Sequence, residues 1–276
     1  MKKITILSAL FLASTMFFIG CKKEEVKKDD SNTNNTASGL MVVKKNTSLV
    51  SKTTATWCGP CGAWGWTLFN DIISSNSDKA IYVGLYASNS ASNKNDLFYQ
   101  PSATTLANEW GIKGYPTFST NGYNTMRYSG NGGIYTSLSK NTTDSAVNAH
   151  TSASVLANAN NSFKIEGNKV KVNLTTKFFE DKAGEYYVAT YLIEDKAKSV
   201  QDGQTGTVEH HYVYRGAFDG KVWGTKINKI GANQTEDFTA EITFQDTWDS
   251  KNFKVINVIY KLVNGKYIFV NANSTK

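Results

Sequence analysis

Between residues 41 and 150, short apolar runs of strand length alternate with stretches whose apolar positions have helical spacing. A strand is expected just before the cysteine pair, and a second, almost wholly apolar one lies about 25 residues later. The spacing Cys61, Trp64, Leu68 and Ile72 places four apolar side chains on one face of a helix. The expected strands are 49–55, 80–86 and one starting at Thr117.

Two more helices are expected in this half. Pro101 suits the first turn of a helix, and Gly111 suits its end. A weaker helix is expected at 134–148. Alternating strands and helices predict an α/β domain over residues 41–150.

After residue 151 the pattern changes to a period of two. Val170, Val172 and Leu174 alternate with polar residues, which is typical of a half-buried strand. Similar strands are expected at 186–193, 238–244, 253–262 and 267–270. About seven strands with turn signals between them predict an antiparallel, immunoglobulin-like β-sandwich domain over residues 151–276.

The N-terminus has the pattern of a secretory signal peptide. Lys2 and Lys3 precede an uncharged apolar run, which is short for a spanning helix. The sequence Phe-Ile-Gly-Cys at 18–21 resembles a lipobox, which implies cleavage of residues 1–21 and a lipid on Cys21. The alternatives are an ordinary signal peptide and an uncleaved anchor. Residues 22–40 are polar and aperiodic, which predicts a disordered tether.

Charge distribution and cysteine count narrow the classes of function that the chain can have. The chain has 276 residues and a net charge of +7, but its basic residues are scattered, so no nucleic-acid site is expected. It has three cysteines. If Cys21 carries lipid, only Cys58 and Cys61 remain, and a lone C-x-x-C pair indicates chemistry rather than a structural disulfide framework.

The segment Trp57-Cys58-Gly59-Pro60-Cys61 lies between a predicted strand and a predicted helix. A helix N-terminus favours thiolate over thiol, and the thiolate is the nucleophile in disulfide exchange. Cys58 is therefore expected to be the exposed attacking residue and Cys61 the resolving residue.

A zinc site is the alternative for a C-x-x-C pair, and it needs four ligands. The three histidines, His150, His210 and His211, are far away in sequence. No metal and no other cofactor is expected.

A second motif, Gly114-Tyr115-Pro116-Thr117-Phe118, follows the cysteines. Together with Trp57–Cys61 it resembles the active-site loop and cis-proline segment of thioredoxin, and the resemblance covers about residues 41–150. It implies that Pro116 is cis and packs against the disulfide. It also implies that Trp57, Tyr115 and Pro116 form the substrate-binding surface.

The sequence departs from thioredoxin in three places. Residues 87–100 look like an insertion, and Tyr115 is bulkier than the usual small residue. Lys52 stands where thioredoxin has a buried aspartate that helps proton transfer. An ammonium there would stabilise the Cys58 thiolate, so Lys52 is expected to modulate the pKa of that thiol.

A broader resemblance concerns the whole chain. The lipoprotein signal, the cysteine motif and the segments 191–195, 211–215 and 252–256 resemble the Omp-twenty-eight-related outer-membrane lipoproteins of Bacteroidetes-type bacteria. The resemblance implies a lipid-anchored protein of the cell envelope, at the outer membrane, and implies no defined reaction.

Two functions remain open. The first is a thiol–disulfide oxidoreductase whose partners are envelope proteins with thiols or disulfides, with an unknown electron donor or acceptor. The second is a surface lipoprotein with a binding or structural role, in which the thioredoxin fold is a scaffold.

Overall fold

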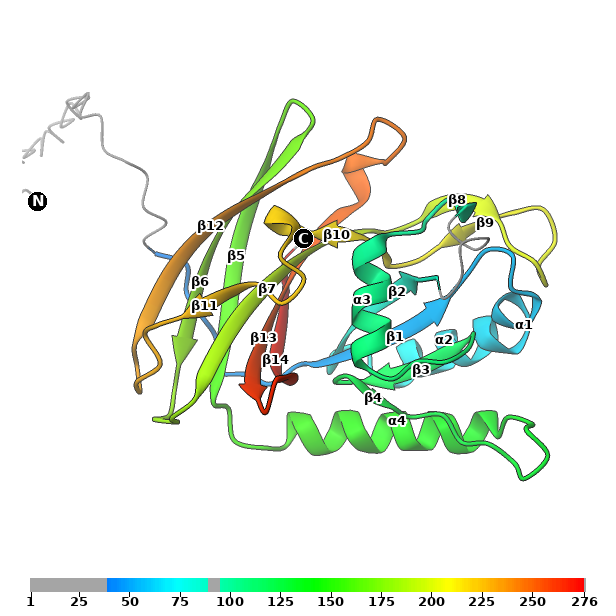
Figure 1. Cartoon of the computed structure of the whole chain (residues 1–276), viewed down its shortest axis with the longest axis horizontal. Coiled ribbons are helices and arrows are strands. Elements are labelled where there is room, and N and C mark those ends of the chain that lie inside the picture. Colours follow the sequence, from blue (N-terminus) through cyan, green and yellow to red (C-terminus); the bar gives the residue numbers. More distant parts are fainter. Residues whose placement is uncertain (1–38, 89–94, 276) are drawn as a thin grey trace, which may run out of the picture. The chain divides into compact units, whose positions relative to one another are not determined.

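The computed structural model describes residues 39–88 and 95–275. Within these ranges the protein is mostly β sheet with few helices (Figure 1). The predicted signal peptide, the lipidation residue Cys21 and most of the predicted tether lie outside the described residues. The expected insertion is described only at its two ends.

The largest sheet has nine strands, in the order β14-β13-β7-β10-β2-β1-β3-β4, with β11 paired to β7. The predicted strands of the first half are present. β1 and β2 are parallel, and β1 is antiparallel to β3. Their bounds are β1 Ser48–Thr54, β2 Ala80–Tyr86, β3 Thr117–Thr120 and β4 Tyr123–Asn124.

Four helices accompany these strands. They are α1 Gly59–Gly62, α2 Trp64–Ser75, α3 Pro101–Glu109 and α4 Thr136–Thr151. The expected single helix from Cys61 to Ile72 is wrong in one respect, because the chain breaks at Ala63 (φ −77°, ψ −108°). At Gly62 the backbone oxygen of Asp202 lies 2.1 Å from where a Cβ would be, so only glycine fits there.

The same sheet continues into the second half of the chain. Gly84 of β2 pairs with Val213 of β10, and its N–H donates to the Tyr212 oxygen over 2.7 Å. The sheet thus includes strands from both sides of residue 151, and the two-domain division stays a prediction. These strands are β7 Glu185–Glu194, β10 Val213–Ala217, β11 Thr225–Ile227, β13 Phe253–Val263 and β14 Lys266–Thr275.

A second sheet of three strands packs on the β7–β13 end of the first. Val172 of β6, Leu192 of β7 and Val255 of β13 share one apolar core. The immunoglobulin-like form of this half stays a prediction. The remaining strands are β5 Ala157–Glu166, β6 Lys169–Phe178 and β12 Thr235–Thr243, and the hairpin of β8 Ala197–Val200 with β9 Thr207–His210.

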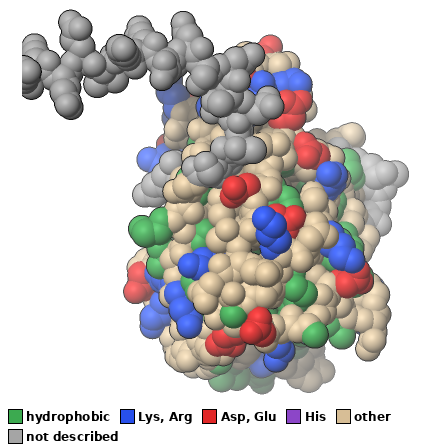
Figure 2. Space-filling model, turned by 90° about the vertical axis from the view of Figure 1, so that its left-hand side faces the viewer, with side chains coloured by type: hydrophobic (Ala, Val, Ile, Leu, Met, Phe, Trp, Pro, Cys, Tyr) green, Lys and Arg blue, Asp and Glu red, His purple; other side chains and the backbone are tan. Residues whose placement is uncertain are grey.

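The central core joins the two halves of the chain. Leu49 of β1, Leu85 of β2 and Tyr214 of β10 are buried in one cluster with side chains of β7 and β13. On the face seen in Figure 2, Lys and Arg side chains are interspersed with Asp and Glu. No helix of the described residues is long and apolar enough to cross a membrane.

Candidate active site

Cys58, in the loop that joins β1 to α1, forms a disulfide with Cys61 of α1. Cys61 is fully buried and Cys58 is 5% exposed. The expectation of an exposed Cys58 is therefore wrong, although it is the more accessible of the two. The loop between β8 and β9 and the side chain of Tyr115 lie against the pair and account for its burial.

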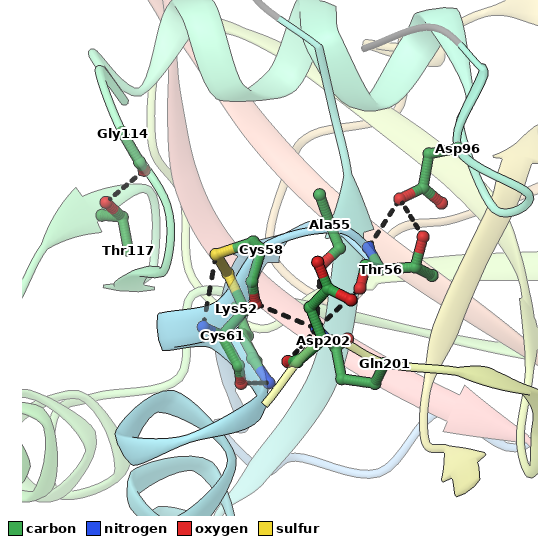
Figure 3. Close-up of a disulfide and its surroundings, with 10 residues drawn as sticks. All are labelled: Lys52, Ala55, Thr56, Cys58, Cys61, Asp96, Gly114, Thr117, Gln201 and Asp202. Atoms are coloured by element: carbon green, nitrogen blue, oxygen red, sulfur yellow. Dashed lines mark hydrogen bonds between the residues drawn. A yellow bond between two sulfur atoms is a disulfide. The ribbon is translucent and has the colours of Figure 1, made fainter. Parts of the chain in front are cut away.

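A backbone amide is directed at the Cys58 sulfur. The N–H of Cys61 donates to Cys58 Sγ over 3.2 Å (Figure 3). The helix that begins here has only four residues before the break at Ala63. The Cys58 sulfur therefore faces one local N–H group of a short helical turn rather than the N-terminus of a long helix.

The second predicted motif lies beside the disulfide. The Tyr115–Pro116 peptide bond is cis, as the resemblance implies. Pro116 packs on α2, where its Cγ lies 2.6 Å from the position a Cβ on Gly65 would take. Tyr115 packs against the two cysteines and meets Trp57 edge to face, with ring centroids 5.9 Å apart.

These residues give the site an accessible aromatic edge. Trp57 is 42% exposed, and Tyr115 is half-buried. The structure thus brings together four predicted residues, namely Trp57, Cys58, Cys61 and Tyr115. Pro116 follows Tyr115 and packs against Gly65 of α2. Residues 57 and 115 thus form an aromatic surface beside the disulfide.

Lys52 lies beneath the cysteines on β1 and is 5% exposed. Its Nζ donates to the Cys61 carbonyl oxygen over 3.2 Å, and it lies over the rings of Trp66 and Phe69. Burial lowers the pKa of this ammonium to about 7. The lysine therefore changes charge near neutral pH, next to Cys61.

Other side chains hold the loop, and no pattern in the sequence indicates them. Asp96 accepts from the Thr56 N–H over 2.6 Å and from its hydroxyl over 2.8 Å. Gln201, between β8 and β9, donates to the carbonyl oxygens of Ala55, Thr56 and Cys58. Gln201 is more than 140 residues from these partners, so no local pattern reveals the contact.

The two neighbouring histidines have separate roles. His210 Nδ1 lies 2.7 Å from the Tyr86 hydroxyl, and burial lowers the pKa of His210 to about 4. His211 Nδ1 lies 2.8 Å from Asp195 Oδ1. Within the residues that the structure describes, no cluster of three or more potential metal-ligating side chains occurs.

Comparison with known proteins defines the fold class. No protein-family model and no curated protein matches the sequence. HBP35 of Porphyromonas gingivalis is similar in structure, with a TM-score of 0.65 and 18% identity over 84% of this chain and 76% of that chain. The chain thus shares a mostly β fold with HBP35.

Weaker similarities cover less of the chain. The sporulation control protein Spo0M of Bacillus subtilis has a TM-score of 0.28 and 16% identity, over 44% of this chain and 47% of that chain. A protein from Archaeoglobus fulgidus has a TM-score of 0.22 and 11% identity, over 43% of this chain and 91% of that chain.

Proposed function

We propose that the protein is a thiol–disulfide oxidoreductase of the bacterial envelope, with a thioredoxin-like site. The observation that carries the proposal is the Cys58–Cys61 disulfide, next to the cis Tyr115–Pro116 bond and the exposed Trp57. A structural staple is a poor explanation for this disulfide, because a bridge across four residues restricts the unfolded chain little.

The reduced protein transfers two electrons to a substrate disulfide. The Cys58 thiolate attacks one substrate sulfur, the substrate S–S bond breaks, and the other substrate sulfur leaves as a thiolate. Cys61 then gives its proton to the released substrate thiolate and attacks Cys58 Sγ. The second substrate thiolate leaves, and the Cys58–Cys61 disulfide remains. An envelope dithiol must return two electrons to complete the cycle, and the reverse sequence oxidises a substrate dithiol.

The direct test is exchange with a soluble protein disulfide. The wild-type protein with dithiothreitol should reduce the interchain disulfides of insulin several-fold faster than dithiothreitol alone, because the pair adds an activated thiolate. Cys58→Ser should remove the added rate. The proposal fails if wild type and Cys58→Ser give the same rate.

The second candidate function is a binding or structural surface lipoprotein. The 5% exposure of Cys58 favours it, since a buried sulfur is hard for a folded partner to reach. In that case the disulfide is inert, and insulin reduction by wild type equals that of the reductant alone.

We also propose that a lipid on Cys21 anchors the protein at the outer membrane. The support is the apolar run that ends in Gly20-Cys21, followed by a polar segment. Cells given labelled palmitate should label the wild type but not Cys21→Ser. Equal labelling of both, or labelling of neither, contradicts the anchor.

A further inference from the structure

The loop between β8 and β9 packs against residues 55–62, the segment called here the cysteine loop. Gln201 is 2% exposed, and its Nε2 lies 3.0–3.1 Å from the carbonyl oxygens of Ala55, Thr56 and Cys58. The N–H of Asp202 donates to the Thr56 oxygen over 2.8 Å, and Gln204 Nε2 donates to the Gly62 oxygen over 2.5 Å. Figure 3 shows Gln201 and Asp202 on the opposite side of the cysteines from Gly114 and Thr117.

The backbones of the two loops are in close contact. A Cβ on Gly203 would lie 2.4 Å from the Gly59 oxygen, and one on Gly62 would lie 2.1 Å from the Asp202 oxygen. Gly203 also has a φ of +87°, which favours glycine. Glycine on both sides therefore permits an approach that side chains would prevent.

The carbonyls that Gln201 binds belong to the turns that orient Cys58. The Ala55 oxygen accepts the Cys58 N–H over 3.2 Å, and the Cys58 oxygen accepts the Cys61 N–H over 3.0 Å. The same Cys61 N–H donates to Cys58 Sγ. Fixing these two carbonyls thus fixes the amide that faces the sulfur.

The base of the hairpin is firmly attached to the first half of the chain. His210 closes β9 and packs edge to face on Phe98 and Trp66, with ring centroids 4.9 and 5.5 Å apart. Its Nδ1 contacts the Tyr86 hydroxyl on β2. The hairpin is therefore held at its base by His210 and at its tip by Gln201 and Gln204.

We propose that Gln201 is a positioning residue for the redox site, holding the Cys61 amide against the Cys58 sulfur so that the thiolate is stabilised. The second half of the chain then supplies part of the site. This inference rests on the proposed function for its catalytic consequence, but thiolate stabilisation is measurable without any substrate.

The test is the pH profile of Cys58 alkylation by iodoacetamide in the reduced full chain, followed by mass spectrometry of the Cys58 peptide. Gln201→Met keeps the length of the side chain and removes its donors. At any pH below the midpoint of the alkylation profile, Gln201→Met should lower the fraction of Cys58 thiolate by about threefold or more. The reason is that the Cys61 amide loses its fixed position. Gln204→Met is the matched control, since it loses a donor to Gly62 only, and its profile should stay within error of wild type.

An unchanged profile in folded Gln201→Met overturns the inference, as does an equal shift in both variants, which would indicate general loop packing. If Gln201→Met does not fold, amide hydrogen exchange of the reduced wild type decides. Slow exchange at Cys58 and Cys61 supports the inference, and exchange at the rate of an unstructured chain overturns it. Failure of the proposed function gives a different result. In that case the wild type does not reduce insulin, although the alkylation and hydrogen-exchange results remain as expected.

Discussion

Lys52 is a buried amine whose surroundings are mainly aromatic rings and one carbonyl oxygen. Because water is excluded, the charged form is penalised, and its pKa of about 7 leaves comparable amounts of ammonium and amine at neutral pH. The ammonium stabilises a neighbouring thiolate, and the amine is able to accept a proton. The sequence placed a lysine here but did not predict its neutral form, which results from burial by the tertiary fold.

Lys52→Met should therefore raise the pH at which the thiols of the pair are half-alkylated, by about half a unit or more, because a nearby positive charge is lost. The difference from wild type should shrink above pH 7, where Lys52 loses its proton. Lys113, an exposed residue before the Tyr115 loop, is the control. Lys113→Met should change little, since its charge is screened by solvent. Identical profiles for Lys52→Met and wild type would contradict this role.

At the scale of elements, the sequence predicts β1, the cysteine motif and the helix after it, but it does not predict the β8–β9 hairpin. The strand, the cysteine loop and the helix that follow one another are local in sequence, so periodicity indicates them. The β8–β9 hairpin has four-residue strands with mixed exposure and no clear period. Its position follows from contacts with β2 and the cysteine loop, which lie more than 100 residues earlier.

His210 makes the base of this hairpin sensitive to acid. Its pKa is about 4 in the folded protein because burial disfavours the charged ring, against 6.5 for an ordinary histidine. Tyr86, Lys52 and Asp96 are the titratable groups near it. Between pH 6.5 and 4 the unfolded chain binds a proton that the folded protein does not, so this group lowers stability as the pH falls through that window.

The free energy of unfolding, measured by urea titration, should therefore decrease from pH 7 to pH 4 by up to about 3 kcal/mol from His210 alone. His210→Phe keeps an aromatic ring against Phe98 and removes this contribution, so its stability should depend less on pH over the same range. An equal pH dependence in the two proteins would show that His210 is protonated at no cost.

For the whole molecule, the central core is the feature that sequence reasoning could not anticipate. Side chains of β1 and β2 share one buried cluster with those of β7, β10 and β13. The change of period near residue 151 correctly indicated where helices give way to strands, because α4 ends at Thr151. It did not reveal that β10 pairs with β2, since pairing between distant strands leaves no periodic signal in either strand.

If the proposed redox function holds, this shared core gives the second half of the chain a part in the site. The first half supplies both cysteines, the cis-proline segment and Lys52. The second half supplies Gln201, which binds the Cys58 carbonyl oxygen, and it buries the edge of β2. We propose that this combined site carries out disulfide exchange with Cys58 as the attacking residue.

Covalent trapping of partner proteins shows whether Cys58 is the attacking residue. Cys61→Ser, expressed in cells as the full chain, should accumulate mixed disulfides with envelope proteins, because Cys58 attacks and nothing resolves the intermediate. These complexes should appear on non-reducing gels and disappear with reductant, and Cys58→Ser, the matched control, should accumulate few. The account is contradicted if Cys58→Ser traps as many partners as Cys61→Ser, or if neither variant traps any while the wild type leaves insulin disulfides unchanged.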